Sequence, residues 1–523
     1  MGMDPSAPLA GAALPTHAPA LTRLAWTGGL ALIGAYCLLF VLLSPLPIQD
    51  FPDHLARAVA MDDLLFHGGA RFGGHFQFHL ELIPYLLGDL ILTAAVAVLG
   101  PTGGGAFWIL LVFLSLPCAA IFYLRVRGID PASRSLALLL SIYFATDWFF
   151  LMGFLSFRVA VAMLIATLAL VELLRRKWSY GLFALYSGAV VLDYFMHLSP
   201  IIFLFAALGV TGLLRLWLRT TTLRTEVALF VPVLLVLTWH FTVGVHYREP
   251  TDPVAGAYFW GTLQSKLQRI GSEFFHFVPR TDVLMVLLLA ACLFARTGVP
   301  RWRDLRRPLV LEMLALTVLF VGTYFALPIG YAEAFYVDTR PLPFASFFFI
   351  VACLALPRPD PVTHPGRERL AFALAALLAI GNLAYLARHF IAQSAWIAQY
   401  RNVVAAIPEH GRALPVYTHS GDGAVVPFLH VSGYVSMDRA AVEPYVFAGD
   451  NGNPMKYFRY RHRPYDPTET WYGEIPRPPI DWDAVARDYD YLVITKPFDP
   501  AVLALSTRTV TENSSAALLA IQK

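Results

Sequence analysis

The sequence predicts an all-α polytopic membrane bundle, followed by a small α/β domain at the C-terminal end. Of the 523 residues, 57% are hydrophobic and only 14% are charged, whereas about 25% are charged in a typical soluble protein. The mean hydropathy is +0.58, and the apolar residues form runs that suit a hydrocarbon core about 30 Å thick. We therefore expect about 11–12 hydrophobic segments.

Composition also excludes several classes of protein. The 34 Arg and 5 Lys are spread along the chain and leave a net charge of only +3, which argues against a nucleic-acid partner. The four cysteines lie singly in apolar runs and favour neither a disulfide framework nor a zinc site. The sequence holds no Walker A, dinucleotide-binding or H-E-x-x-H motif, so ATP hydrolysis, dinucleotide chemistry and zinc proteolysis have no support.

The hydrophobic segments follow a short leader. Residues 1–20 are rich in Ala and Pro and are expected to be disordered, and a membrane domain is expected over 21–390. Its apolar runs lie near 24–43, 80–99, 107–124, 135–151, 154–173, 181–196, 199–214, 226–243, 282–295, 309–327, 342–356 and 370–387. An amphipathic helix over about 258–279 is expected to lie in the outer interface, because its apolar residues recur every three or four positions.

The distribution of Arg and Lys predicts the orientation in the membrane. Alternate loops are rich in Arg from Arg125 onwards, and such loops stay in the cytoplasm. This places the C-terminal region on the outer side of the cytoplasmic membrane. We expect a bacterial source, because the Ala-rich, Arg-rich composition is typical of a GC-rich genome. If Arg23 is also cytoplasmic, the runs at 80–99 and 107–124 do not both cross the membrane, and one of them is re-entrant or lies on its surface.

Residues 391–523 are expected to form a soluble extracytoplasmic α/β domain. They include 14 acidic and 12 basic residues, a higher density of charge than in the preceding chain. Residues 414–417, 424–429 and 491–495 have the pattern of short strands, and residues 482–487 that of a helical turn.

The first outer loop, residues 45–77, holds the most specific pattern in the sequence. Asp50, Asp53, His54 and Arg57 lie at positions i, i+3, i+4 and i+7, and Pro52 suits the first turn of a helix. These four side chains therefore share one helix face at the membrane boundary. In the simplest interpretation Asp50 caps the helix, Asp53 pairs with Arg57, and the face is merely solvated.

The same residue types also suit catalysis on a phosphorylated substrate. A carboxylate removes a proton from an acceptor hydroxyl most effectively when its surroundings raise its pKa. A second carboxylate orients the first or, with it, holds a divalent cation, so Asp50 and Asp53 are candidate metal ligands as well as candidate catalytic residues. The guanidinium of Arg57 matches the geometry of a phosphate.

The stretch Asp50–Arg57 resembles the D-x-P-x-H-L-A-R motif of bacterial membrane proteins in the GT-C superfamily of glycosyltransferases. The layout of the whole chain is also similar to that of protein mannosyltransferases and the lipid A aminoarabinose transferase of this superfamily. The resemblance implies a catalytic acid in the first outer loop, Asp50 or Asp53, and a soluble C-terminal domain outside. The chain departs from the family in lacking a clear acidic motif in the second outer loop and a W-W-D-type motif.

Other candidate substrate-binding residues lie on the same predicted side. Arg340 is placed to hold the phosphate of a donor and Asp338 to orient it, with Glu333 nearby. His197 lies at the outer end of a span, and Arg158 at the outer start of another. Each has a structural alternative: an arginine that reaches lipid head groups, a histidine that packs with a hydrogen bond, or an anchor of a helix end.

The main hypothesis from the sequence is a membrane glycosyltransferase that uses a polyprenyl-phosphate-linked sugar donor. Its acceptor would be an envelope lipid, polysaccharide or protein on the outer face, with a divalent cation as the one cofactor considered. One alternative is a polytopic transporter or lipid flippase, which would carry paired charges deep within its spans and pseudo-repeated halves. The other is a non-enzymatic envelope assembly protein, which would tolerate the loss of Asp53.

Overall fold

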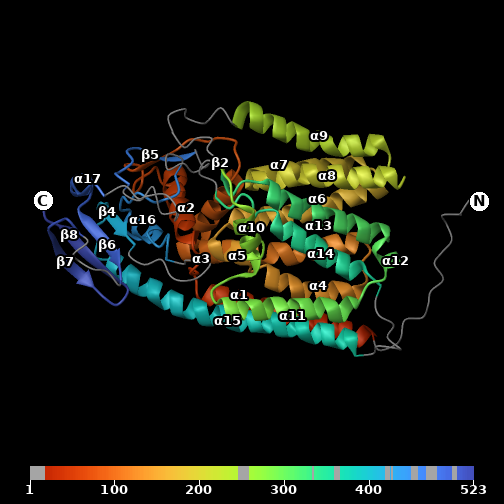
Figure 1. Cartoon of the computed structure of the whole chain (residues 1–523). Coiled ribbons are helices and arrows are strands. Elements are labelled where there is room, and N and C mark those ends of the chain that lie inside the picture. The colour runs from red at the N-terminus through yellow and green to blue at the C-terminus, as the bar shows by residue number, and fades with distance from the viewer. Residues whose placement is uncertain are drawn as a thin grey trace, which may run out of the picture.

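The computed structural model describes residues 18–244, 258–331, 335–357, 366–417, 425, 428–448, 457–466, 480–496 and 503–523. Long helices run side by side through most of the molecule, and a small sheet lies at one end (Figure 1). We call this the sheet end; it carries strands β4 (Ala413–Val416), β6 (Tyr491–Thr495), β7 (Thr507–Glu512) and β8 (Ala516–Ile521). The other end, where Arg127, Arg175 and Arg215 meet acidic partners, is called the basic end.

The bundle confirms the predicted polytopic membrane fold. Its long helices are α1 (Ala18–Leu42), α3 (Leu86–Val126), α4 (Pro131–Phe144), α6 (Leu155–Arg176), α7 (Tyr180–Met196), α8 (Leu198–Trp217), α9 (Leu223–Trp239), α11 (Pro279–Thr297), α13 (Pro308–Ala326), α14 (Leu342–Ala355) and α15 (Arg367–Val404). Within the described ranges, eight helices are long and apolar enough to span a membrane, and α11 forms a ninth candidate with the bent segment before it. The helices α7 and α14 are apolar but shorter.

The helix α3 explains the conflict between the two early apolar runs. Residues 80–99 and 107–124 largely fall within α3, but its two halves are separate helices that meet at a sharp turn, where Gly100 has a φ of +70° and is followed by Pro101. A side-chain carbon at Gly104 would lie 2.6 Å from the backbone nitrogen of Val96, so the second half starts against the end of the first. Its first turn holds Asp89, which contacts Arg57 at the sheet end, and Arg127 directly after it pairs with acids at the basic end. The Ser44 hydroxyl donates to the Thr102 carbonyl, so the break itself lies near the end of α1 at the sheet end. The run at 107–124 therefore passes between the two ends, whereas the run at 80–99 stays at the sheet end.

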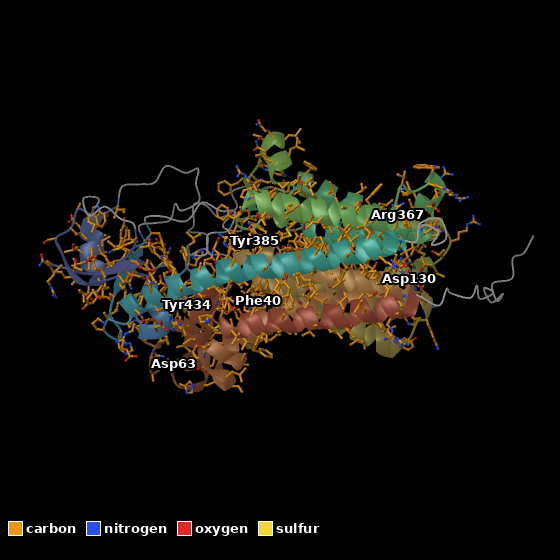
Figure 2. The ribbon with its side chains drawn as sticks, turned by 90° about the horizontal axis from the view of Figure 1, so that it is seen from below. Phe40, Asp63, Asp130, Arg367, Tyr385 and Tyr434 are labelled. Atoms are coloured by element: carbon orange, nitrogen blue, oxygen red, sulfur yellow. The ribbon has the colours of Figure 1, made fainter. Side chains whose placement is uncertain are left out.

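Polar caps and buried side-chain contacts set the helix boundaries and the packing. The N-caps of α4, α7 and α9 each accept a hydrogen bond from a backbone N–H in the first turn, as side chains of this type favour; they are Asp130, Ser179 and Thr222. The long helix α15 lies beside α1, and the Tyr36 hydroxyl donates to the Ala379 carbonyl at 3.0 Å. Figure 2 shows Arg367 and Asp130 near the basic end, and Asp63 and Tyr434 at the sheet end.

Short elements complete the sheet end and the loops. They are α2 (Phe51–Phe66), α5 (Trp148–Met152), α10 (Leu263–Arg269), α12 (Trp302–Leu305), α16 (Gly433–Arg439), α17 (Trp482–Asp488), the π-helix His240–Gly244, the 3₁₀-helix Ser272–Phe274, β1 (Phe76–Phe78), β2 (Tyr258–Phe259), β3 (Gly330–Tyr331) and β5 (Phe458–Tyr460). The main sheet has the order β4-β6-β8-β7, with β4 and β6 parallel and the remaining pairs antiparallel. The small sheet β1-β5 joins the first loop to the C-terminal region.

Two boundaries differ from the sequence expectations. The helix expected over 258–279 is divided into β2, α10 and a 3₁₀ turn, because Gly271 ends α10 and the Lys266 ammonium turns inward to backbone carbonyls at the end of α13. The last long helix continues past residue 390 to Val404 before the sheet begins. The strands near 414 and 491 and the helix near 482 are present, whereas residues 424, 426 and 427 of the third expected strand and most of the leader 1–20 lie outside the described residues.

Candidate functional site

Helix α2 positions the candidate residues of the first loop. Asp50 occupies its N-cap and Pro52 its first turn, as the sequence predicts. The apolar face of α2 packs on α3, where Phe51 comes so close to Gly105 that a methyl group there would lie 3.1 Å from the ring. The opposite face carries Asp53 and Arg57, which are 0% and 1% exposed. The polar face is therefore buried under another part of the chain rather than solvated.

The covering part is the C-terminal region, and it brings a histidine to the two aspartates. His430 places Nε2 3.5 Å from Asp50 Oδ1 and Nδ1 2.9 Å from Asp53 Oδ2. The contact with Asp53 is close in distance but is not aligned as a hydrogen bond. Asp50 is 7% exposed and also accepts a hydrogen bond from the Gln49 side-chain amide at 3.3 Å. Two carboxylates and an imidazole therefore meet between α2 and the C-terminal region.

Arg57 is held by three protein groups through its two terminal nitrogens. Its Nη2 donates to Asp89 at 2.6 Å and to His54 Nδ1 at 2.9 Å, and its Nη1 donates to the Phe447 carbonyl at 3.1 Å. The Tyr457 hydroxyl donates to the other oxygen of Asp89. The expected pairing of Asp53 with Arg57 is thus replaced by an ion pair between Arg57 and the first turn of α3.

Arg57 also fixes the protonation of His54. Because the guanidinium has only donors, His54 Nδ1 must accept, which leaves the ring proton on Nε2 for the backbone of Gly153. Burial, with Arg57 second, lowers the pKa of His54 well below its ordinary value. His54 is therefore a neutral, oriented side chain at this site.

Two glycines allow the close approach of the surrounding loops. A side-chain carbon at Gly433, at the start of α16, would lie 2.5 Å from the Pro52 carbonyl and 2.7 Å from Asp53 Oδ1. One at Gly153, whose φ is +90°, would lie 2.7 Å from the backbone nitrogen of Asp50. The second outer loop and the C-terminal region therefore contact the first turn of α2 directly.

Burial sets the electrostatics of the acids. It raises the pKa of Asp50 to about 7, with His430 lowering the pKa and Asp53 raising it to a smaller extent. Burial also raises the pKa of Asp53 well above its usual range, although Arg57 opposes the shift. Glu443 faces Asp53, and burial raises the pKa of its carboxyl as well. Asp50 is the acid that changes charge near neutral pH.

A second group of polar side chains lies against the first turn of α3, on the side away from Arg57. Arg340 approaches His197 Nε2 at 3.4 Å and donates to Ser199 Oγ at 3.2 Å. The His197 ring packs on Tyr85, the N-cap of α3, with centroids 4.7 Å apart. Burial, followed by the charge of Arg340, lowers the pKa of His197 well below its ordinary value. His197 and Arg340, two of the substrate-binding candidates from the sequence, thus lie at the same end of α3 as Asp89 and Arg57.

Residues close to Arg340 in the sequence include one that lies near Asp50. Tyr336 is close enough for the charge of Asp50 to contribute to raising the pKa of its hydroxyl, after burial as the main cause. Asp338 is fully buried and accepts from Arg269 Nη2 at 2.8 Å. Glu333, the remaining candidate of this loop, lies outside the described residues.

Arg158 lies deeper in the bundle. It forms an ion pair with Asp147 at 3.0 Å, and Asp147 also caps α5. Both residues line a small, largely apolar cavity of about 40 Å³ whose other walls come mainly from α3, α4 and α14. Its polar end thus lies at Arg158, and its apolar walls suit a hydrocarbon chain.

The described residues hold no group of three or more His, Cys, Asp or Glu side chains arranged for a metal ion. Asp50 and Asp53, the possible metal ligands in the sequence, meet His430 instead. This histidine and Glu443 were not found from the sequence, because neither lies in a motif. Asp89 could have been found from the sequence, because an acidic residue within an apolar run is a functional candidate.

Comparisons with known proteins bear on the fold. No protein family and no curated protein matches the sequence. Among solved structures, the chain is similar to ArnT from Cupriavidus metallidurans in the apo state, with a TM-score of 0.55 and 13% sequence identity. The similarity covers 97% of this chain and 98% of that one. The helical bundle and the C-terminal region together therefore have a fold similar to that of ArnT.

Proposed function

We propose that the protein is a membrane glycosyltransferase that moves a sugar from a polyprenyl-phosphate-linked donor to an envelope acceptor. The observation that carries the proposal is Asp50, a buried carboxylate with a pKa near neutrality, placed directly after the first span of a GT-C-like fold. The similar structure, ArnT, is a lipid A aminoarabinose transferase. The sheet end would face outwards from a bacterial inner membrane, because the arginine-rich loops gather at the opposite end.

In the proposed reaction Asp50 acts as the general base. The acceptor hydroxyl transfers its proton to the Asp50 carboxylate while its oxygen forms a bond to the anomeric carbon of the sugar. The bond from that carbon to the phosphate oxygen breaks, and polyprenyl phosphate leaves with the electron pair. Asp50 suits this step better than Asp53, because it is the less buried of the two and its pKa lies nearer the working pH.

The remaining candidates have roles that follow from their contacts. Arg340 is partly exposed beside His197, so the three residues His197, Asp338 and Arg340 would bind and orient the donor phosphate, with Glu333 on the same loop. The apolar cavity next to Arg158 would accept part of the hydrocarbon chain. Arg57 and His54 would hold the first turn of α2 in place, since both are engaged by protein groups.

The test is mass spectrometry of envelope glycans and glycolipids from a deletion strain. The strain would be complemented with wild type, Asp50→Asn, Asp53→Asn or Asp62→Asn at matched protein levels. Asp62 is the matched control, because it lies on the same helix but pairs only with the exposed His67 at 3.5 Å. We expect wild type and Asp62→Asn to restore a missing sugar and Asp50→Asn not to restore it. An unchanged glycan profile in the deletion strain would contradict glycosyl transfer and favour transport or assembly.

A further inference from the structure

We propose that His430 is a positioning residue for Asp50, so that the C-terminal segment 428–447 is part of the active site. The proposal deepens the proposed function, because it assigns a partner to the proposed general base. It rests first on the place of the ring, which lies between two carboxylates with one nitrogen near each of them. Its side chain is only 13% exposed, so water competes little with these contacts.

Several contacts independent of the carboxylates hold the ring in place. The helix α16 packs on α2, and Gly433 allows its backbone to reach Pro52. The Phe447 ring contacts both His430 and His54, with centroids 4.9 and 5.3 Å apart, while the Phe447 carbonyl accepts from Arg57. Strand β5 pairs with β1 of the first loop nearby. The segment is therefore docked on α2 from two sides of the histidine.

The chemistry of a neutral imidazole explains why one histidine suits two acids. Burial lowers the pKa of His430, so near pH 7 the ring carries one proton and has one donor and one acceptor nitrogen. If Nε2 carries the proton, its N–H lies beside an ionised Asp50, and the lone pair of Nδ1 lies beside a protonated Asp53, at 3.5 and 2.9 Å respectively. This assignment agrees with Asp53 being the more deeply buried acid. His430 would then keep Asp50 ionised and point its free oxygen towards the acceptor.

Charged and titratable groups from several elements surround Asp50, Asp53 and His430. Asp50 faces Gln49, Asp53, His430 and Tyr336. Asp53 faces Arg57 and Glu443, and three tyrosines also lie within the reach of its charge; they are Tyr400, Tyr417 and Tyr460. Arg57 is neutralised by Asp89, which leaves His430 as the group that lowers the pKa of Asp50 most.

The experiment measures the titration of carboxyl groups in the purified full-length protein by infrared difference spectroscopy. Asp50→Asn identifies the Asp50 signal by removing it. His430→Phe keeps a ring but removes both nitrogens, whereas His430→Gln keeps a donor that reaches towards Asp50. His462→Phe is the control, because His462 is exposed in the same region. Thermal unfolding is recorded for each variant to verify that it is folded.

We expect the midpoint for Asp50 to move up by about one pH unit in His430→Phe, since a donor to the ionised form is lost. It should move much less in His430→Gln and stay at the wild-type value in His462→Phe. An unchanged midpoint in a folded His430→Phe protein would overturn the proposal.

The outcome can be separated from that of the proposed function. If the midpoint shifts as expected but Asp50→Asn restores every glycan, His430 positions Asp50 in a protein that is not this transferase. If Asp50→Asn abolishes transfer but neither the midpoint nor the pH dependence of transfer responds to His430→Phe, the transferase stands and the role of His430 is wrong.

Discussion

Two clusters of buried charge lie at the two ends of the bundle, and they differ in how their carboxylates are paired. At the basic end Glu172 and Glu312 are each held by Arg127 and Arg215 at 2.6 to 3.1 Å. At the sheet end Asp50 and Asp53 have no lysine or arginine within ion-pair distance among the described residues, and their only such contact is His430. The nearby guanidinium of Arg57 is directed to Asp89.

The difference separates a cluster that stabilises the fold from one that is available for chemistry. A buried carboxylate that is matched by arginines holds helices together, and loss of one partner leaves an unpaired charge. A buried carboxylate without such a partner has a raised pKa and reduces stability when ionised, which is common at functional sites. The predictions below test whether function and stability divide in this way between the two ends.

The largest effect is expected from Asp50→Asn. Loss of a general base typically lowers the rate by about 10²- to 10⁴-fold, so transfer measured by mass spectrometry should fall by that amount. The same variant should unfold at a higher temperature at pH 8, because it removes a buried negative charge. Asp62→Asn should change neither quantity. A variant that lost activity and stability together would show that Asp50 supports the fold.

Arg127→Met should have the opposite pattern. Removing one partner from a buried ion-pair network costs about 3–5 kcal/mol, and Arg127 contacts both Glu172 and Glu312. We expect a lower free energy of unfolding in denaturant titrations but nearly wild-type transfer per folded molecule. A specific loss of transfer in the folded fraction would show that the basic end takes part in function.

These two regions were not equally visible in the sequence. The face formed by Asp50, Asp53 and Arg57 could be predicted, because helical spacing depends only on local sequence. Its partners could not, since His430 and Phe447 come from a region more than three hundred residues away and lie in no motif. The ion pair expected between Asp53 and Arg57 was wrong for the same reason. Arg57 instead pairs with Asp89 of α3, and only the packing of α2 on α3 determines this partner.

The membrane fold was the easiest part to predict, and its details show the limit of hydropathy. Apolar runs locate spans well because the bilayer imposes their length. The arginine pattern showed that the runs at 80–99 and 107–124 do not both cross, but hydropathy did not reveal which one does, since the sharp turn at Gly100 and Pro101 is set by backbone conformation.

Gly433→Ala tests the docking of the C-terminal region at the sheet end. The added methyl group would lie 2.5 Å from the Pro52 backbone, so α16 must move away from α2. Overpacking of this kind costs about 1–3 kcal/mol, and we expect transfer to fall about tenfold through the displacement of His430. Gly74→Ala, where the methyl group would meet open space, is the control. Equal activity of the two variants would show that this close approach is dispensable.

The smallest expected effect is the pH dependence of wild-type stability. The pKa of Asp50 is raised from 3.8 to about 7 in the folded protein, so the folded state binds its proton more tightly than the unfolded state does. Its contribution to stability is therefore complete below pH 4 and is lost as the pH rises through about 7. Transfer should rise over the same upper part of this range, because the ionised form is the base.

Comparing wild type with Asp50→Asn isolates this contribution from all other titrating groups. The free energy of unfolding of the two proteins should converge at acid pH and separate by about 1–3 kcal/mol towards pH 8, with the variant more stable. Arg127→Met should instead be destabilised at both pH 6 and pH 8, because the contacts that it loses, with Glu172 and Glu312, do not depend on the charge of Asp50. Parallel curves for wild type and Asp50→Asn would mean that Asp50 is solvated or paired in solution, and the two ends would then not differ as proposed.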